Sequence, residues 1–534
     1  MSLNFFNRVV TASLALLIFS QPVLAQSFSQ DLQKALSQAS VKGLAFEDKR
    51  AFEDFYKERG YAPLWRDEDD REEAIDILAE SWRHGFHPAQ YNVNVLSSIS
   101  KSDHVEDLAP REAMFSAAVV KYARDLTGMR VPASSINQID SFWRQPLSAY
   151  TVLSHIAKKR DAESALRDFA PRNSLYSALQ DELIVQIKRA SNPDEIERLL
   201  PLSFGGTLKP GDYHRRVNDL RLVLDMRSEP QNEQYDDRLL QAVMAFQQDN
   251  GLETDGILGP QTLEALNRTA LDKIKQVIAN LERLRWQEPN RPGKYLIVNI
   301  PAQTLWAIED GQTQLEMPVI VGRPGRETMS FVTRVTGVRF NPTWTVPRTI
   351  KFEDYVPKLK KDPLYMEGKN VRFIRDGQTL NPSSINWNEL NASEISRISM
   401  VQAPGSNNPL GYIRLLMPNR YNIYLHDTNA AGLFAQSLRT ESSGCVRMSE
   451  PRAVASFILK DNAGWSDQNI DNYLSGGEMS DIPAENPIPA YLLYQSIWQD
   501  AGRGLVYSND IYGWDERLFN ELESRNEVFV PRID

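Results

Sequence analysis

The sequence predicts a multidomain α+β protein with a helical N-terminal domain, a compact three-helix module and a mostly β domain that carries a long insertion. The apolar spacing is helical up to about residue 286, changes to strand-type runs near residue 292, and is broken by a charged stretch at about 348–406. With 534 residues, 42% of them hydrophobic, the chain is long enough for several separate cores.

Residues 1–25 have the layout of a secretory signal. Arg8 precedes an apolar stretch over residues 9–19, and residues 23–25 (Val-Leu-Ala) approximate the small-residue cleavage pattern. The apolar stretch is shorter than the roughly twenty residues that span a bilayer, so we expect cleavage rather than anchoring. An uncleaved signal would instead hold the protein at the inner membrane. Either outcome predicts export, and we expect a periplasmic protein.

The charge balance excludes one class of partner. The chain carries 60 Lys and Arg against 70 Asp and Glu, a formal net charge of −10. Nucleic-acid binding relies on clustered basic residues, so nucleic acid is not expected as a partner. After the signal, no apolar run reaches the length of a transmembrane helix.

A helical N-terminal domain is expected over residues 26–210. Apolar residues recur at helical spacing in three stretches, at 52–56, 74–82 and 113–126. His84-Gly85 ends the second stretch. No residue here has the type and spacing of a catalytic group, so a supporting role is predicted.

A three-helix module is expected over residues 214–268, with helices at 216–226, at 237–249 and from Gly259-Pro260 onward. The run at 245–252 (AFQQDNGL), followed by 255–262 (DGILGPQT), closely resembles the peptidoglycan-binding module. The alternative is an ordinary three-helix bundle. A connecting helix is expected at 271–286.

A mostly β domain is expected over residues 292–475. Its strands are predicted at 295–300, 304–309, 316–321, 331–340, 411–417 and 421–426, with Asp310-Gly311 as a hairpin turn. The insertion at about 348–406 is expected to be irregular and is a candidate lid. Ser449 and Pro451 are expected to open a helix that runs to about residue 460. Residues 476–534 are expected to form a C-terminal extension.

Cys445 is the single cysteine of the chain. An exported chain with one thiol cannot form an internal disulfide, so Cys445 is either an inert core residue or a reactive nucleophile. Its surroundings, Ser442-Ser443-Gly444-Cys445-Val446-Arg447, are polar and contain glycine. Such a setting is unusual for a buried, inert cysteine and favours the nucleophile.

His426 precedes Cys445 by nineteen residues and ends a predicted strand, on the same face as Tyr424. An imidazole within hydrogen-bonding reach of a thiol takes its proton and generates a thiolate. Gly444 permits a tight backbone, and the amides at 444–446 are candidates for an oxyanion hole. Arg447 is a candidate to lower the pKa of the thiol or to bind a substrate carboxylate.

These motifs resemble those of a known family. His426-Asp427-Thr428 and the sequence SSGCVRM at 442–448 look like the catalytic motif of the YkuD-like L,D-transpeptidases. The resemblance spans roughly residues 292–465, and together with the signal, the helical domain and the module it extends to the large periplasmic L,D-transpeptidases of Gram-negative bacteria. Many members have His where Ser443 stands, so no second motif histidine is carried over and His426 is the only base.

The resemblance implies a cysteine-dependent acyltransferase that needs no metal or cofactor. Cys445 would attack the carbonyl between the third residue of a tetrapeptide stem and its terminal D-alanine, which leaves as a thioester forms. The side-chain amine of a second stem would then form a 3→3 cross-link, with His426 as base and then acid. Gly444 would belong to the oxyanion hole.

The same resemblance suggests the substrate contacts. Tyr424 and Trp344 are candidates for cleft walls, and Arg447 and Ser443 for substrate contacts. Core packing is the alternative role of Tyr424 and Trp344, and a surface ion pair is that of Arg447. The expected partners are peptidoglycan stems and glycan, and the expected covalent inhibitors are carbapenems.

Two other functions compete with this one. In an L,D-carboxypeptidase, water would resolve the same thioester. A non-catalytic wall-binding scaffold would bind sacculi without forming a thioester. The sequence leaves the acceptor open between a stem, a free D-amino acid, a lipoprotein lysine and water.

Overall fold

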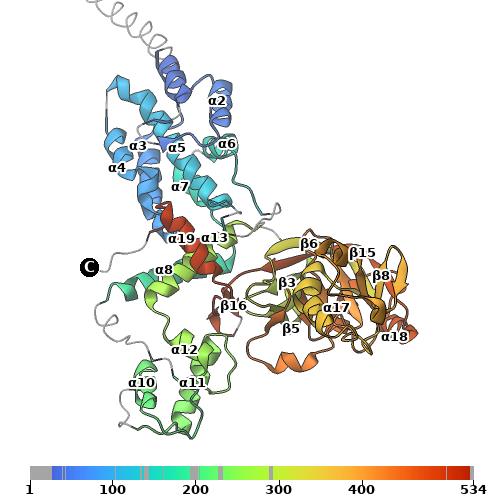
Figure 1. Cartoon of the computed structure of the whole chain (residues 1–534). Helices are drawn as coiled ribbons and strands as arrows, with labels where there is room; N and C mark the ends of the chain where they lie inside the picture. The colour runs from blue at the N-terminus through green and yellow to red at the C-terminus, as the bar shows by residue number, and fades with distance from the viewer. Residues whose placement is uncertain are drawn as a thin grey trace, which may run out of the picture.

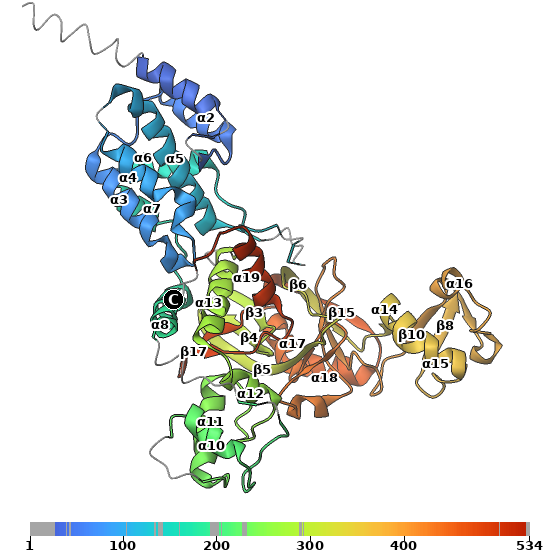
Figure 2. The same ribbon diagram turned by 60° about the vertical axis from the view of Figure 1, so that its left-hand side comes forward.

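Figures 1 and 2 show an N-terminal helical lobe, a small helical module and a β-rich lobe that meet around two helices, α13 (Ala270–Arg285) and α19 (Trp514–Ser524). The computed structural model describes residues 27–529, apart from 39, 42–43, 103, 133–134, 137–142, 160, 193–201, 204, 227–231, 288–290, 292 and 501. The expected signal at residues 1–25 lies outside the described residues. The architecture is multidomain α+β, as the sequence predicts.

The N-terminal lobe is a helical bundle with one continuous apolar core. Its helices are α2 (Lys49–Glu58), α3 (Glu68–Ala79), η1 (Glu80–His84), η2 (Pro88–Tyr91), α4 (Val93–Ser100), α5 (Val105–Thr127), α6 (Ala149–Lys159) and α7 (Ala162–Arg167), with a small β1 (Ser40–Val41) and β2 (Leu44–Ala45) pair. The next helix, α8 (Ser174–Ala190), packs instead with α13 and α19 in a separate core. The three helical stretches expected from the sequence fall on α2, on α3 with η1, and on α5. Gly85 ends η1 at φ +75°, the left-handed conformation that glycine adopts without strain.

The break between α2 and α3 is held by a buried carboxylate on the central helix α5. Glu112 accepts hydrogen bonds from the Tyr56 hydroxyl at 2.6 Å and from the backbone amides of Leu64 and Trp65 at 2.7 and 3.0 Å. Burial raises the pKa of Glu112, and these donors oppose that rise. A buried polar group is stable only when it is paired, so this carboxylate fixes the turn to the bundle.

The small module consists of α10 (Arg216–Val223), α11 (Asp237–Asp249) and α12 (Pro260–Leu266), around its own core. The Asp236 side chain caps α11 by accepting from the Leu239 amide at 3.0 Å. Gln247 donates to Asp255 at 2.8 Å and accepts from the Gly256 amide at 2.8 Å. These bonds hold the 251–259 connection against α11, so the module's motif residues shape its loop.

The β-rich lobe is a closed sheet. The strand order is β13-β5-β14-β12-β11-β6-β15-β3-β4, and β4 also pairs with β5, which closes eight strands into a barrel with β13 attached to β5. The strands are β3 (Lys294–Asn299), β4 (Thr304–Glu309), β5 (Gln312–Gly322), β6 (Phe331–Phe340), β11 (Ile413–Leu416), β12 (Leu425–His426), β13 (Thr440–Ser442), β14 (Val446–Met448) and β15 (Ser480–Leu493). Helices α17 (Pro451–Leu459) and α18 (Asp467–Gly476) accompany the barrel, and α17 and Ile470 of α18 share its core.

Three expectations for this lobe were wrong. Strand β12 covers only Leu425–His426, because Asn422 has φ +55° and Asn419 hydrogen-bonds the backbone of Tyr421 and Ile423 instead. β15 lies between β6 and β3, so the barrel extends past the expected boundary at residue 475. Ser449 does not cap α17, whose N-cap residue is Glu450 with no side-chain cap bond.

The insertion at 348–406 is ordered rather than irregular. It has its own sheet, β7-β10-β8-β9, made of β7 (Trp344–Thr345), β8 (Val371–Arg375), β9 (Gln378–Leu380) and β10 (Ser399–Gln402). The helical segments are α14 (Arg348–Ile350), η3 (Lys351–Tyr355), α15 (Val356–Lys361), η4 (Pro382–Ser384) and α16 (Ala392–Arg397). A separate apolar core that includes Trp344, Leu359 and Trp387 holds it together, and Figure 2 shows this lobe projecting from the barrel.

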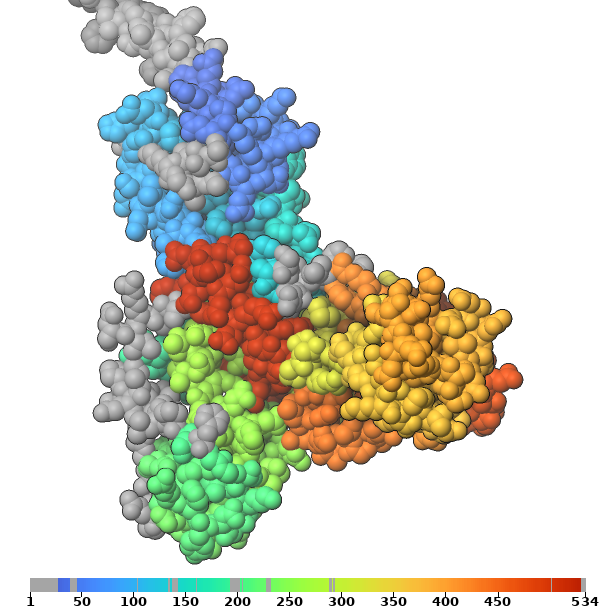
Figure 3. Space-filling view, viewed as in Figure 1, coloured from blue at the N-terminus to red at the C-terminus, as the bar shows by residue number. Residues whose placement is uncertain are grey.

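The C-terminal segment joins the lobes. The hairpin β16 (Ile497–Asp500) and β17 (Gly504–Tyr507) leads to α19, and Figure 3 shows this red segment between the helical lobe and the barrel. Arg283 of α13 forms an ion pair with Asp515, and Gln276 donates to the Ser508 carbonyl at 2.8 Å. The C-terminal segment therefore holds α13 in place.

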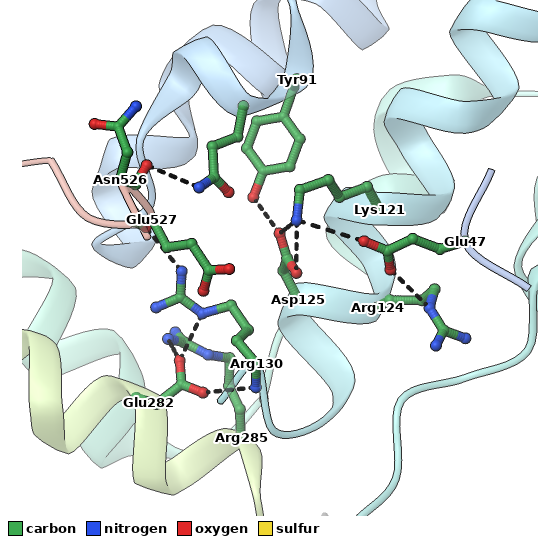
Figure 4. A network of polar contacts seen from close by, with 11 residues as sticks. Glu47, Tyr91, Lys121, Arg124, Asp125, Arg130, Glu282, Arg285, Asn526 and Glu527 are labelled. Atoms are coloured by element: carbon green, nitrogen blue, oxygen red, sulfur yellow. Dashed lines mark hydrogen bonds and ion pairs between the residues drawn. The ribbon is translucent and has the colours of Figure 1, made fainter. Parts of the chain in front are cut away.

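A buried charge network ties α13 to the helical lobe (Figure 4). Glu282 accepts from Arg130 at 2.7 Å and from Arg285 at 2.6 Å, and both the Glu282 and Arg285 side chains are fully buried. Burial alone would raise the pKa of Glu282, but the two guanidinium groups outweigh it and hold the pKa at about 2. Arg130 also donates to the Glu527 carbonyl at 2.8 Å. None of the helices in the described part of the chain has the length and apolar character needed to cross a membrane.

Candidate active site

Cys445 lies in the short connection between β13 and β14, which are both paired with β5. Gly444 before it has φ +108°, a backbone conformation that only glycine adopts readily. The Ser442 hydroxyl donates to the Cys445 carbonyl and accepts from the Gly444 amide at 3.1 Å. The motif residues therefore form a hydrogen-bonded turn that presents a half-buried thiol.

His426 lies on the neighbouring strand. β12 runs parallel to β14, with Leu425 paired with Val446 and His426 paired with Arg447. The imidazole is buried, and its Nδ1 is hydrogen-bonded to the Asp427 carbonyl oxygen. Because a carbonyl only accepts, Nδ1 carries the proton and Nε2 is left as a proton acceptor.

The protonation states favour a neutral pair at rest. Burial lowers the pKa of His426 to about 3, assisted by the positive charges of Arg447 and Arg414. Burial raises the pKa of the Cys445 thiol, while the Tyr424 backbone, Arg414 and Arg447 oppose that rise. A protonated thiol next to a neutral imidazole is a nucleophile that becomes active through proton transfer.

Within the described residues, no hydrogen bond joins Cys445 to His426. The thiol instead donates to the Asn422 carbonyl, with 3.7 Å between sulfur and oxygen. Strand pairing places His426 opposite Arg447, two residues after Cys445, and catalytic hydrogen bonds often tighten only when substrate is bound. The pairing of β12 with β14 thus allows proton transfer from Cys445 to His426, although the two side chains are not hydrogen-bonded in the resting structure.

The amides near Cys445 are not all available for an oxyanion. The Gly444 amide is occupied by the Ser442 hydroxyl, and the Val446 amide donates to the Tyr424 carbonyl at 2.9 Å. In the described structure the amides of Ser443 and Cys445 are the two in this turn without an acceptor. In the resting structure the Gly444 amide is therefore engaged within the turn, while its neighbours offer free N–H groups; the oxyanion role expected of Gly444 stays a prediction.

Of the other predicted site residues, Tyr424 and Arg447 lie beside Cys445 and His426, whereas Trp344 lies in the core of the insertion. Tyr424 is half-buried beside the site, with the Arg414 guanidinium 4.3 Å from its ring centroid. Arg447 is paired with His426 across the strands. Trp344 packs against Tyr355 in the core of the insertion, which matches the core-packing alternative. Its ring makes no described contact with Cys445 or His426.

Ser443 links the nucleophile turn to the insertion. Its hydroxyl accepts from Arg326 at 3.0 Å, and the same guanidinium donates to Asp354 at 2.7 and 2.9 Å and to Glu353 at 2.6 Å. Both acids lie in η3, at the base of the insertion. Ser443 stands where many members of the family with this motif carry histidine, and in this chain it forms a structural contact with Arg326.

Arg414 is a site residue that the sequence analysis missed. It lies on β11, opposite His426 in the register, and its charge acts on both His426 and Cys445. Its Nε is buried and has no partner in the described structure. No spacing marks Arg414, because it becomes part of the site only through the pairing of β11 with β12.

Thr328 and Tyr512 support the nucleophile turn from outside the motif. Thr328 donates through Oγ1 to the Gly444 carbonyl at 2.8 Å and accepts from the Gly322 amide at 2.8 Å. The Tyr512 hydroxyl donates to the Gly322 carbonyl at 2.6 Å and accepts from the Thr328 amide at 3.3 Å. Tyr512 comes from the C-terminal segment, so no local pattern links it to Cys445.

Comparisons with known proteins match three parts of the chain to known families. Residues 293–463 match the family described as the L,D-transpeptidase catalytic domain (YkuD), residues 50–183 match a scaffold domain, and residues 221–266 match the family described as "Putative peptidoglycan binding domain". A curated protein of Haemophilus influenzae named "Putative L,D-transpeptidase" is 35% identical over 247 residues, which are 46% of this chain and 49% of the relative. The chain thus matches about half the length of that relative.

Solved structures of L,D-transpeptidases also resemble the chain, at low similarity. One from Mycobacterium smegmatis is 12% identical, covers 38% of this chain and 58% of its own, and has a TM-score of 0.20. One from Xylanimonas cellulosilytica is 15% identical, covers 55% of this chain and 99% of its own, and has a TM-score of 0.18. These scores are too low to compare details of the folds. From the matched families, the chain carries a YkuD L,D-transpeptidase catalytic domain together with a scaffold domain and a peptidoglycan-binding domain.

Proposed function

We propose that the protein is a periplasmic peptidoglycan L,D-transpeptidase that forms 3→3 cross-links through a thioester on Cys445. The observation that carries the proposal is the parallel pairing of β12, which ends in His426, with β14, which begins directly after Cys445, within a domain that matches the L,D-transpeptidase family. The family match to a peptidoglycan-binding module supports peptidoglycan as the substrate. The signal-like residues 1–25 support export to the periplasm.

In the first step, Cys445 loses its proton to His426 Nε2 and its sulfur attacks the carbonyl carbon that joins the third stem residue to the terminal D-alanine. The amides of Ser443 and Cys445 stabilise the oxyanion. His426 then gives its proton to the nitrogen of D-alanine, the C–N bond breaks, and a thioester remains.

In the second step, the side-chain amine of another stem attacks the thioester. His426 takes a proton from this amine, and the sulfur leaves as the new amide bond forms. The leaving thiolate recovers the proton from His426, which returns the site to its neutral resting state. Arg414 and Arg447 lie close enough to act electrostatically on this thiolate, and they are also candidates to hold the carboxylate of the donor stem.

Intact-mass spectrometry after exposure to a carbapenem tests the proposal. We expect one covalent adduct on the native chain and none on Cys445→Ala. A folded native chain that stays unmodified would reject the thioester mechanism. His426→Gln is expected to acylate at least about 100-fold more slowly, in line with the usual contribution of a general base.

Product analysis separates the proposal from L,D-carboxypeptidase activity. With purified disaccharide tetrapeptides, a transpeptidase yields 3→3 dimers together with D-alanine. A carboxypeptidase yields tripeptides and D-alanine without dimers. Tripeptides alone, at acceptor concentrations that saturate the rate, would assign the water-resolved reaction to this chain.

A further inference from the structure

A groove lies between the peptidoglycan-binding module and the barrel, away from Cys445. It consists of two adjoining cavities of about 310 and 260 Å³ that share Leu252, Glu253, Gln261 and Ser437 as lining residues. Figure 1 shows β16 between the module and the barrel, and Trp498 of this strand also lines the groove. Clefts of this size at domain boundaries are typical ligand sites.

The lining combines aromatic faces with unpaired polar groups. Trp306 of β4 and Trp498 are both half-buried, and neither indole N–H has a hydrogen-bond partner within the described residues. The side chains of Glu253, Gln261 and Glu316 also form no hydrogen bond or ion pair there. Aromatic faces bind the C–H faces of pyranose rings, while carboxylates and amides accept and donate hydrogen bonds to hydroxyl and acetamido groups.

The charges favour a glycan over a stem peptide. The two arginines that line the groove are already engaged: Arg439 donates to the Val319 and Gln303 carbonyls at 3.2 and 3.1 Å, and Arg503 pairs with Asp500 at 2.9 Å. Glu253 acts electrostatically on Arg439, and Glu316 acts on Arg503, so the acidic and basic groups of the lining largely offset one another. A lining with this balance suits an uncharged stretch of sugar rings better than a stem peptide with its carboxylates.

The peptidoglycan-binding module packs closely against the C-terminal segment beside the groove. A Cβ added to Gly251, which has φ +63°, would lie 2.8 Å from Val506 and 2.9 Å from the Trp498 ring. Arg503 donates to the Gln248 carbonyl at 3.3 Å, and Arg268 of the module side donates to Asn509 at 2.7 Å. These contacts hold the module on the C-terminal segment and so fix the positions of the two sides of the groove relative to each other.

One wall of the groove continues to the nucleophile. The segment 434–439 lines the groove and runs directly into β13 and the turn that carries Cys445. The backbone of Arg439 is fixed to β5 through the Val321 amide, which donates to its carbonyl at 2.9 Å. A polymer held in the groove therefore lies against the segment that leads into the nucleophile turn.

We propose that this groove binds the glycan strand of peptidoglycan, an uncharged polymer of N-acetylated hexosamine rings, and so presents the attached stems to Cys445. This inference rests on the proposed function, and it assigns the binding site to both the module and the barrel. Tethering raises the effective concentration of stems at the active site without requiring tight binding of each stem.

Calorimetric titration tests whether the groove binds glycan. It uses the full chain with the Cys445→Ala change, which prevents the reaction. The probes are chitohexaose and glycan strands from which an amidase has removed the stems. We expect Trp306→Ala and Gln261→Ala to weaken glycan-strand binding at least tenfold. Tyr213→Ala, which removes a 72% exposed aromatic of the module outside the groove, should leave it unchanged. Circular dichroism verifies that each variant is folded.

The outcomes separate this inference from the proposed function. Equal glycan affinity in the native, Trp306→Ala and Gln261→Ala chains would overturn the groove, as would binding of a soluble tetrapeptide but not of stem-free glycan. Failure of the native chain to form a carbapenem adduct would reject the thioester mechanism and leave the glycan titration intact. If the groove variants bind glycan as tightly as the native chain while the carbapenem adduct still forms, the glycan site is rejected and the thioester mechanism stands.

Discussion

Thr328 Oγ1 donates a hydrogen bond of 2.8 Å to the carbonyl oxygen of Gly444, the residue before the candidate nucleophile. The same hydroxyl accepts from the Gly322 amide at 2.8 Å, so one buried side chain joins β5 to the nucleophile turn. The turn's left-handed glycine is therefore held from both sides, by Ser442 within the motif and by Thr328 outside it.

Thr328→Val tests this support. The change keeps the side-chain shape and leaves the Gly444 carbonyl and the Gly322 amide without their partner, at a cost of about 1–3 kcal/mol for each group. We expect slower acylation of Cys445 by a carbapenem, with rescue by Thr328→Ser. Thr333→Val removes a similar hydroxyl-to-carbonyl bond on β6 and serves as the matched control. Equal acylation rates in the two valine variants would remove Thr328 from the positioning role.

The pH dependence of Cys445 alkylation tests the neutral resting pair. Burial raises the pKa of this thiol above its ordinary value of 9.0, so the alkylation rate with iodoacetamide should keep rising above pH 9. His426 has a pKa of about 3 and stays neutral across this range, so His426→Gln should leave the shape of the profile unchanged. A plateau reached near pH 7 in the native chain, lost in His426→Gln, would instead indicate a preformed thiolate–imidazolium pair.

Arg326 is expected to couple the insertion to the nucleophile turn. Arg326→Gln removes the bonds to Ser443, Asp354 and Glu353 together. We expect faster hydrogen exchange over residues 348–361 and a higher KM for the donor peptide, because the base of the insertion loses its link to the turn. Arg452→Gln breaks an exposed ion pair with Asp471 between α17 and α18 and should change neither readout. Unchanged exchange at 348–361 in Arg326→Gln would contradict the coupling.

Glu282→Gln is expected to loosen the junction between α13 and the helical lobe. Removing this charge leaves Arg130 and Arg285 buried without a counter-ion, which typically costs about 3–5 kcal/mol. Thermal unfolding should show the loss, while Glu163→Gln, which removes an exposed pair with Arg167, should have little effect.

The same carboxylate predicts an acid sensitivity. Its pKa is about 2 in the folded chain against 4.5 for an ordinary Glu, so the unfolded state binds more protons as the pH falls. The stability that Glu282 contributes is present above pH 4.5 and is lost between pH 4.5 and about 2. The fall in unfolding free energy over this range should be shallower in Glu282→Gln than in the native chain. Parallel curves would show that Glu282 does not carry this part of the acid sensitivity.

Much of the fold follows from local pattern. The helical spacing of α2, α5 and α11 and the apolar runs of β3, β4 and β6 are properties of short segments, and each forms where the sequence predicts it. Gly444 and Asp310-Gly311 also adopt the left-handed conformations that their turns require. Short stretches decide these features because backbone preference and one-sided burial act over a few residues.

The insertion and the strand before His426 show where local pattern fails. Residues 348–406 look charged and irregular, yet an apolar core formed by distant parts of the insertion orders them. Residues 421–424 alternate like a strand, yet the Asn419 side chain bonds their backbone and replaces the sheet pairing. In both segments, contacts made after the chain has folded outweigh the local preference.

The residue types of the site can be read from the amino-acid sequence alone: one thiol, one imidazole on the strand before it, and a glycine that permits the turn. Tertiary packing sets which amides are free for an oxyanion and places Arg414 with Arg447 beside the thiol. It also brings Tyr512 from the C-terminal segment to support the nucleophile turn, and β15 to complete the barrel. Residue chemistry is a property of single positions, whereas hydrogen-bond occupancy and charge proximity depend on strand pairing between segments far apart in the chain.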